Sequence, residues 1–231
     1  MKRTIIIMAK VPRAGNVKTR LQPFISGEEC RTLAEAFLFD AINKVRNVCH
    51  RLIIAFSPAE EKSYFDEFEN RENLILIEQK GANLGERMAN AFRFAFRSDS
   101  DAAVVIIGTD SPTFPVEFAE RAFADLETKA EIVLGKSDDG GFYLIGVKKI
   151  YPTLFDGIKW SSAKVYEQLI ANIENLKISN FELISGWYDV DTMEDLRRLQ
   201  DELLETEAAR KLAPETSRWM IANRKIFKRK I

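Results

Sequence analysis

The chain has 231 residues, of which 46% are hydrophobic and 30% are charged, and its formal net charge is −1 at pH 7. This balance is typical of a globular protein, and it excludes the disordered, fibrous and collagen-like classes. Single α/β domains of about this length are common. We therefore expect one main domain over residues 1–205, followed by a basic, helical C-terminal extension over residues 206–231.

The cysteines and the lengths of the apolar runs indicate the compartment in which the protein is expected. Cys30 and Cys49 lack CxxC spacing, so neither a disulfide nor a zinc site is expected. The apolar run in the N-terminal segment MKRTIIIMAK is shorter than the core of a signal peptide, and no stretch approaches the roughly 18 apolar residues of a membrane span. We expect a cytoplasmic protein without a transmembrane segment.

The basic charge is concentrated at the C-terminus. The last fifteen residues contain no acid and six basic residues, namely Arg218, Arg224, Lys225, Lys228, Arg229 and Lys230. Such a tail can contact an anionic membrane surface, but a run this short is more often a solvated terminus. No nucleic-acid partner is expected, and we expect the extension to be dispensable for the core.

Short β-branched runs alternate with segments of helical periodicity, which favours βαβ units and a mainly parallel sheet. The strand-like runs are RTIIIMA, RLIIAF, LILIEQ, AAVVIIG and EIVLG. The first helix is expected after Ser26, because Ser26 and Glu29 have the spacing of a capping box. Its apolar stripe consists of Leu33, Ala34, Phe37, Leu38, Ala41 and Ile42.

Four further helices are expected after this first one. They cover residues 84–96, 115–126, 161–173 and 192–204, with the strand FELIS between the last two. In EIVLGKSDDGGFYLIGV, two strand-like runs flank an Asp-Asp-Gly-Gly turn, which favours an antiparallel pair. The predicted fold is α/β, with a mixed, mostly parallel central sheet and helices on both faces.

The loop after the first strand is the first candidate site, because ligands of open parallel sheets bind beyond the carboxyl ends of the strands. Its segment AKVPRAGNVKTRL has Lys10, Arg13, Lys18 and Arg20 around Gly15. Glycine lets the backbone approach a phosphate closely, and arginine can bind two phosphate oxygens. The segment is neither a Walker A loop nor a GxGxxG fingerprint, so a solvated basic loop is the alternative.

Carboxylates follow two later strands. Asp110 comes at the end of AAVVIIG, where it could bind Mg²⁺ or Mn²⁺ or merely cap the turn before Pro112. Asp189 and Asp191 alternate around one residue, so they point the same way in an extended segment. One of them could complete the metal site, although Asp191 or Thr192 could equally be the N-cap of the next helix.

Two glycine-containing segments are weaker candidates. KGANLGERM has Gly81 and Gly85 around a helix start and Arg87 in its first turn, so it could hold a phosphate, a ribose or a base. An ordinary helix start is the alternative. The Asp-Asp-Gly-Gly turn, which contains Asp139, could reach an acceptor or be purely structural. His50 is the only histidine and lacks a nucleophile motif, which argues against a hydrolase triad.

Taken in order, AKVPRAGNVKTRL, GANLGERM, GTDSP, DDGGFYLIG and DVDTMEDL resemble the nucleotide-diphospho-sugar transferase superfamily over roughly residues 4–204. Within it, the chain is most similar to the bacterial and archaeal glycosyltransferase-like group labelled radical-SAM/selenodomain-associated or arsenosugar-biosynthesis transferases. The resemblance implies a three-layer, Rossmann-like glycosyltransferase-A fold and a catalytic domain over residues 1–205. One departure is Gly108-Thr109-Asp110, which keeps only the last aspartate of the usual DxD motif.

The resemblance also implies roles for individual residues. The nucleotide-binding residues would be Ala9, Lys10, Arg13, Gly15, Lys18, Arg20, Gly81, Leu84, Gly85 and Arg87. Asp110 and Asp191 would hold the metal, which we expect to be Mg²⁺ or Mn²⁺. Asp110, Asp139 and Lys18 are the expected catalytic residues, with Asp139 as candidate general base.

Three functions are compatible with these residues. The first is transfer of a sugar from a nucleotide sugar to a small-molecule acceptor. The second is nucleotidylyl transfer, in which a phosphorylated small molecule attacks a nucleoside triphosphate and the loop cations brace the leaving pyrophosphate. The third is a non-catalytic nucleotide-binding protein. We expect glycosyl transfer first, although the cation-rich loop and the incomplete DxD motif fit triphosphate chemistry.

Overall fold

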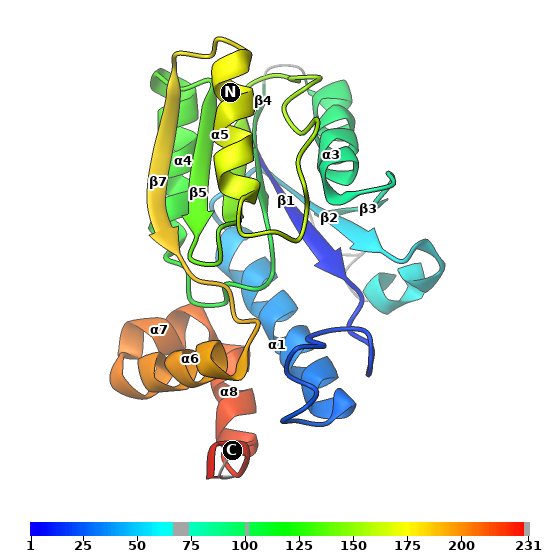
Figure 1. Cartoon of the computed structure of the whole chain (residues 1–231), viewed down its shortest axis with the longest axis vertical. Coiled ribbons are helices and arrows are strands. Elements are labelled where there is room, and N and C mark those ends of the chain that lie inside the picture. Colours follow the sequence, from blue (N-terminus) through cyan, green and yellow to red (C-terminus); the bar gives the residue numbers. More distant parts are fainter. Residues whose placement is uncertain (67–73, 100–101, 229–231) are drawn as a thin grey trace.

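A seven-stranded sheet forms the centre of the molecule in the computed structural model, which describes residues 1–66, 74–99 and 102–228 (Figure 1). The strand order is β3-β2-β1-β4-β6-β5-β7. The bounds are β1 Lys2–Lys10, β2 Arg51–Ser57, β3 Leu74–Glu78, β4 Ala102–Ile107, β5 Ile132–Ser137, β6 Phe142–Val147 and β7 Phe181–Trp187. β6 pairs antiparallel with β4 and β5, and the other strand pairs are parallel. The prediction of a mixed, mostly parallel sheet is confirmed.

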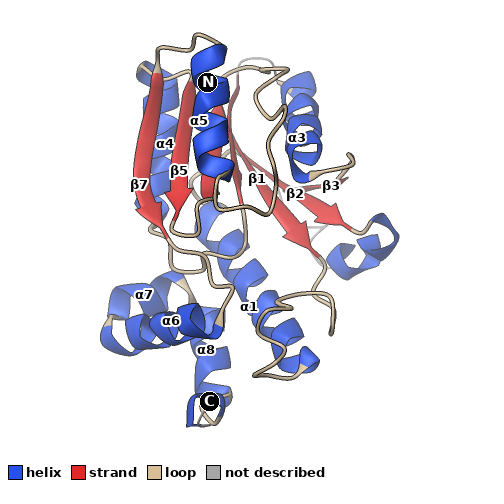
Figure 2. Ribbon diagram, viewed as in Figure 1, coloured by secondary structure: helices blue, strands red, loops and turns tan. Residues whose placement is uncertain are grey.

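Helices cover both faces of this sheet, and the alternation of side chains along each strand decides which helix each residue meets (Figure 2). Ile5 and Ile7 of β1 lie in one apolar cluster with residues of α1 (Gly27–Val45) and α4 (Val116–Thr128). The intervening Ile6 lies in a second cluster with residues of α3 (Leu84–Ser98) and α5 (Val165–Asn175). The predicted three layers are therefore present.

The start of α1 follows the predicted capping box. Ser26 Oγ accepts a hydrogen bond from the Glu29 backbone N–H at 3.1 Å, and Glu29 Oε2 accepts one from the Ser26 N–H at 2.6 Å. Along the predicted stripe, Ala34 is half-buried and the other five residues are buried. A short 3₁₀ helix, η1 (Ala59–Phe65), follows β2.

The prediction for α5 is wrong at its start. The helix begins at Val165 instead of Ser161, and residues 161–164 form a turn. Ser161 has φ 62°, a left-handed backbone conformation that cannot begin a right-handed helix. Ser162 Oγ donates to the Lys159 carbonyl at 2.7 Å, which further stabilises the turn.

The C-terminal helices are α6 (Met193–Glu205), α7 (Glu207–Leu212), α8 (Pro214–Ala222) and the 3₁₀ turn η2 (Ile226–Lys228). They gather beside α1 (Figure 1). Trp219 and Met220 are buried in one cluster with Leu33 and Phe37 of α1, and Trp219 Nε1 donates to Thr32 Oγ1 at 2.8 Å. The predicted extension therefore packs on the core, because residues of α7 and α8 share a buried apolar cluster with α1. Residues 229–231 of the tail lie outside the described residues.

Both cysteines are free thiols, with Cys30 buried and Cys49 half-buried. None of the described helices combines the length and the apolar character that a bilayer-spanning segment needs.

Candidate nucleotide-binding active site

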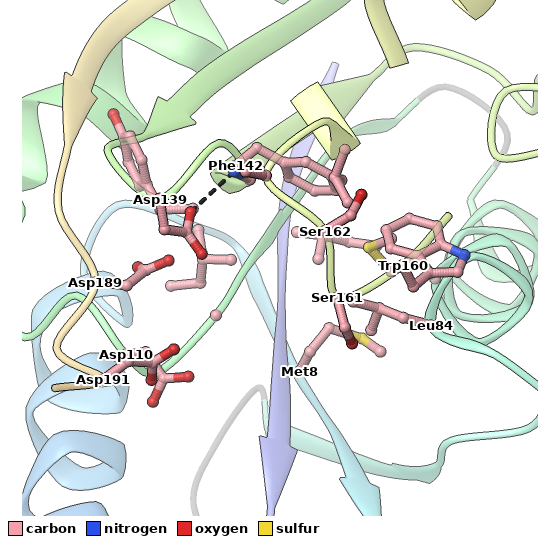
Figure 3. Close-up of a pocket in the computed structure, with 18 of the residues that line it drawn as sticks. Met8, Leu84, Asp110, Asp139, Phe142, Trp160, Ser161, Ser162, Asp189 and Asp191 are labelled. Carbon is pink, nitrogen blue, oxygen red and sulfur yellow. Dashed lines mark hydrogen bonds between the residues drawn. The ribbon is translucent and has the colours of Figure 1, made fainter. Parts of the chain in front are cut away.

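A chamber of about 590 Å³ opens where β1, β4 and β5 end and β6 begins. It adjoins a hollow of about 360 Å³, since both are lined by Met8, Leu84 and Asp110. Carboxylates lie on one side of the chamber, and Met8, Leu84 and Trp160 lie on the other (Figure 3). The sheet topology thus brings segments that are distant in sequence to one edge, as expected for an open parallel sheet.

Lys18 is the centre of the carboxylate side. Its Nζ donates to Asp110 Oδ1 and, at 2.7 Å, to the Val190 carbonyl, and it lies 3.7 Å from Asp191 Oδ1. The Lys18 side chain is only 5% exposed, whereas those of Asp110 and Asp191 are 49% and 38% exposed. One buried ammonium therefore joins the two predicted metal ligands, and both carboxylates still reach the chamber.

Asp189 lies beside these carboxylates and also lines both hollows (Figure 3). It accepts hydrogen bonds from Ser111 Oγ and, at 2.8 Å, from Ser137 Oγ, which ties three loops together. Burial and, secondly, the nearby charge of Asp110 raise the pKa of Asp189 to about 6. Burial also raises the pKa of Asp191, against the opposing effect of Lys18. Burial is thus the main reason that both carboxyl groups bind a proton more tightly than usual.

The raised pKa of Asp189 leads to a stability prediction. The folded protein binds a proton more tightly than the unfolded chain, so the contribution of Asp189 to the free energy of unfolding is present below about pH 4 and is lost as the pH rises through about 6. The loss amounts to at most about 3 kcal/mol. In urea unfolding at pH 4.5, 5.5 and 7, the free energy of unfolding of Asp189→Asn is expected not to show this decrease. Asp138→Asn, at an exposed carboxylate, is the control, and equal pH slopes in the wild type and Asp189→Asn would contradict the assignment.

The cations of the first loop separate into two groups. Lys10 lines the smaller hollow beside Lys18, and Arg20 lines the chamber 3.6 Å from Asp191 Oδ2. Arg13 instead forms an ion pair with Glu61 of η1. Gly15 adopts φ 86°, a conformation that the turn requires of glycine. Ala9 packs in the core, so only its backbone could meet a nucleotide.

The residues of GANLGERM lie around the start of α3. Leu84 lines both hollows, whereas Gly81 and Gly85 line neither of them. A Cβ on Gly85 would lie 2.6 Å from Trp160 Cζ2 and 2.8 Å from Phe155 Cβ, so this glycine permits close packing of the loop before α5. Arg87 Nε donates to the Gly81 carbonyl at 3.2 Å. Nucleotide contacts by Gly81, Gly85 and Arg87 remain predictions.

The wall opposite the carboxylates contains residues that sequence reasoning missed. Phe142, Trp160, Ser161 and Ser162 line it (Figure 3). Trp160 and the serines lie just before α5, in residues that periodicity assigns partly to a helix. Asp139 lies on the carboxylate side, where its Oδ1 accepts the Gly141 N–H at 2.8 Å, and its role as general base remains a prediction.

The carboxylate oxygens of Asp110 and Asp191 are ligands of the kind that Mg²⁺ and Mn²⁺ prefer. Two carboxylates at a solvent-open edge suit a hard cation that shares its remaining ligands with substrate phosphates. Among the described residues no group of three or more His, Cys, Asp or Glu side chains could enclose a metal by itself. Asp110 and Asp191 therefore remain predicted ligands, which would share a metal with the phosphates of a nucleotide.

Comparison with known proteins places the chain in a family. Residues 31–162 match the family described as "Uncharacterized protein conserved in bacteria (DUF2064)". The chain belongs to this DUF2064 family. A solved chain from Desulfovibrio desulfuricans G20, provisionally described as a nucleotide-diphospho-sugar transferase, is 28% identical with a TM-score of 0.88, and the match covers 99% of this chain and 98% of that chain. The resemblance to that superfamily and its fold is confirmed.

Two further similarities of this DUF2064 protein are to named enzymes, one in sequence and one in fold. The 2-phospho-L-lactate guanylyltransferase of Methanocaldococcus jannaschii is 28% identical over 192 residues, which cover 82% of this chain and 80% of the relative. The 4-diphosphocytidyl-2C-methyl-D-erythritol synthase of Anaerococcus prevotii DSM 20548 has a TM-score of 0.54 at 14% identity, covering 88% of this chain and 99% of its own. The second likeness concerns the fold alone.

Proposed function

We propose that the protein is a nucleotidylyltransferase that transfers a nucleoside monophosphate from a nucleoside triphosphate to a small-molecule acceptor. This is the second of the two enzymatic hypotheses from the sequence, and it replaces glycosyl transfer as the preferred one. The observation that carries it is the placement of Lys10 and Lys18 in one hollow beside Asp110. Two cations at that edge suit the charge of a triphosphate and of its leaving pyrophosphate.

In the proposed reaction, an acceptor oxygen attacks the α-phosphorus, the bond from that phosphorus to the β-phosphate oxygen breaks, and pyrophosphate leaves. Lys10 and Lys18 stabilise the departing charge, and Arg20 pairs with phosphate oxygens at the chamber side. Asp110 and Asp191 would hold Mg²⁺ or Mn²⁺, which would neutralise the phosphates when bound. The acceptor would lie between Asp139 and Trp160, and Asp139 would accept the proton if the attacking group is a hydroxyl. GTP is the first donor to test, given the name of the M. jannaschii relative.

Glycosyl transfer is kept as a second candidate because of the description of the D. desulfuricans protein. The two reactions leave different products, since nucleotidylyl transfer releases pyrophosphate and glycosyl transfer releases a nucleoside diphosphate. The experiment measures thermal stabilisation by nucleoside triphosphates and by nucleoside diphosphate sugars with Mg²⁺ or Mn²⁺. It then follows α-labelled GTP, CTP, ATP and UTP in the presence of a small-molecule cell extract. Stronger stabilisation by a triphosphate and label transfer with pyrophosphate release are expected; stronger stabilisation by a nucleotide sugar with diphosphate release would favour glycosyl transfer.

A further inference from the structure

Lys44 is a half-buried cation outside the chamber. It lies in the last turn of α1, and its Nζ donates to the Pro112 carbonyl at 2.5 Å and lies 4.1 Å from the centre of the Phe114 ring. The charges that act on it are Asp40 of its own helix and Glu202 of α6. Burial outweighs both and lowers the pKa of Lys44 to about 7. The Lys44 ammonium thus bonds to the loop after β4, which is the loop that contains Asp110.

The acceptor of this hydrogen bond, Pro112, is two residues after Asp110 in the loop between β4 and α4. The same loop is held from α6, because Thr113 Oγ1 donates to Glu202 Oε2 at 2.8 Å. Tyr188 Oη also donates to Glu202, just before the segment that carries Asp189 and Asp191. Glu202 therefore joins the two loops whose aspartates face the chamber.

The C-terminal helices join this network through Asp40, which is fully buried in α1. Its carboxylate accepts from the backbone N–H groups of Glu215 and Thr216 at 2.9 and 2.8 Å, and from Thr216 Oγ1 at 2.6 Å. Asp40 thus caps α8 from another helix, one turn away from Lys44. The face of α1 that binds α8 also binds the Asp110 loop.

We propose that Lys44 and Glu202 are positioning residues, which hold Asp110 in place through Pro112 and Thr113 without lining the chamber. This proposal adds to the proposed function. It rests on that function for the measurement of kcat, but not for the measurement of hydrogen exchange. Two loops that carry facing carboxylates repel each other, and this network fixes them from behind. Side chains that orient active-site groups in this way commonly change activity by about 10- to 100-fold.

The test compares Lys44→Met with Thr113→Val, and uses Lys211→Met on the exposed face of α7 as the control. Methionine fills a similar volume without a buried charge, so the melting temperature of Lys44→Met is expected to stay within a few degrees of the wild type. Amide hydrogen exchange in residues 108–114 is expected to be at least about 10-fold faster in Lys44→Met and Thr113→Val, with β2 unchanged. The kcat for pyrophosphate release is expected to fall by about 10- to 100-fold, with the KM for the triphosphate changed less than about threefold.

Each result supports or overturns the proposal. Unchanged exchange in residues 108–114 in both variants would overturn it, as would a loss of kcat that follows only a general loss of folded protein. If Lys44→Met does not fold, the hydrogen exchange of Thr113→Val tests the proposal instead. This variant is the milder change, because it removes one hydroxyl and leaves Glu202 bonded to Tyr188. If the wild type releases no pyrophosphate while exchange responds as expected, the proposed function fails and the positioning role remains.

Discussion

Replacement of Asp110 by asparagine is expected to lower the kcat for pyrophosphate release on the order of 100- to 1000-fold, the usual effect of removing one electrostatic contact to a transition state. Asparagine keeps the shape of the side chain but loses the charge that pairs with Lys18 and would bind the metal. Lys18 keeps the Val190 carbonyl and Asp191 as partners, so the fold is expected to persist. Steady-state kinetics with the best triphosphate from the donor screen would measure the effect.

The matched control is Asp138→Asn, which makes the same chemical change at a carboxylate that pairs with Arg198 and does not line the chamber. Its kcat is expected to stay within about twofold of the wild type, as for a surface substitution. Activity of Asp110→Asn equal to that of the control would remove Asp110 from the catalytic machinery.

Deletion of residues 206–231 is expected to abolish cooperative unfolding, although the sequence suggests that this extension is separable. The deletion exposes the apolar face of α1 and removes the three hydrogen-bond donors of Asp40 together with the helix that buries it. Each large apolar side chain that is exposed costs about 1.5–3 kcal/mol, so a few of them are comparable with the total stability of a domain. Urea unfolding followed by circular dichroism measures the loss.

A point variant tests the same interface more gently. Trp219→Ala removes a buried ring and its hydrogen bond to Thr32, and should cost about 3–5 kcal/mol. The control is Ile221→Ala on the same helix, where the side chain is 71% exposed and the cost should stay within about 0.5 kcal/mol. A stable deletion variant, or equal costs at the two positions, would show that the extension is an independent appendage.

Local patterns in the sequence were sufficient for most of the fold. The Ser26–Glu29 capping box, the β-branched runs and the Asp-Asp-Gly-Gly turn each act within a few residues, and the corresponding elements are present. The start of α5 was misassigned because helical periodicity does not reveal the left-handed backbone of Ser161. The sequence also did not reveal that Gly85 packs against Trp160, because the two residues are far apart along the chain.

Part of the candidate site could also be predicted from local sequence patterns. Asp110 and Asp191 follow strands that run in one direction, so the sequence alone could place them at one edge of the sheet. It could not show that Lys18 lies between them, or that Arg13 pairs with Glu61, because side-chain partners depend on the three-dimensional path of the loops.

By itself, the sequence determined the α/β class, the order of the strands along the chain and the cationic loop followed by aspartates at the strand ends. These properties depend on local propensity, on periodicity and on the common direction of parallel strands. Only the tertiary structure decided that the basic C-terminal segment covers α1, and that Lys44, Asp40 and Glu202 connect it to the Asp110 loop. Such contacts join residues that are more than 60 positions apart, and no local pattern encodes which of several exposed or buried partners a charged side chain will meet.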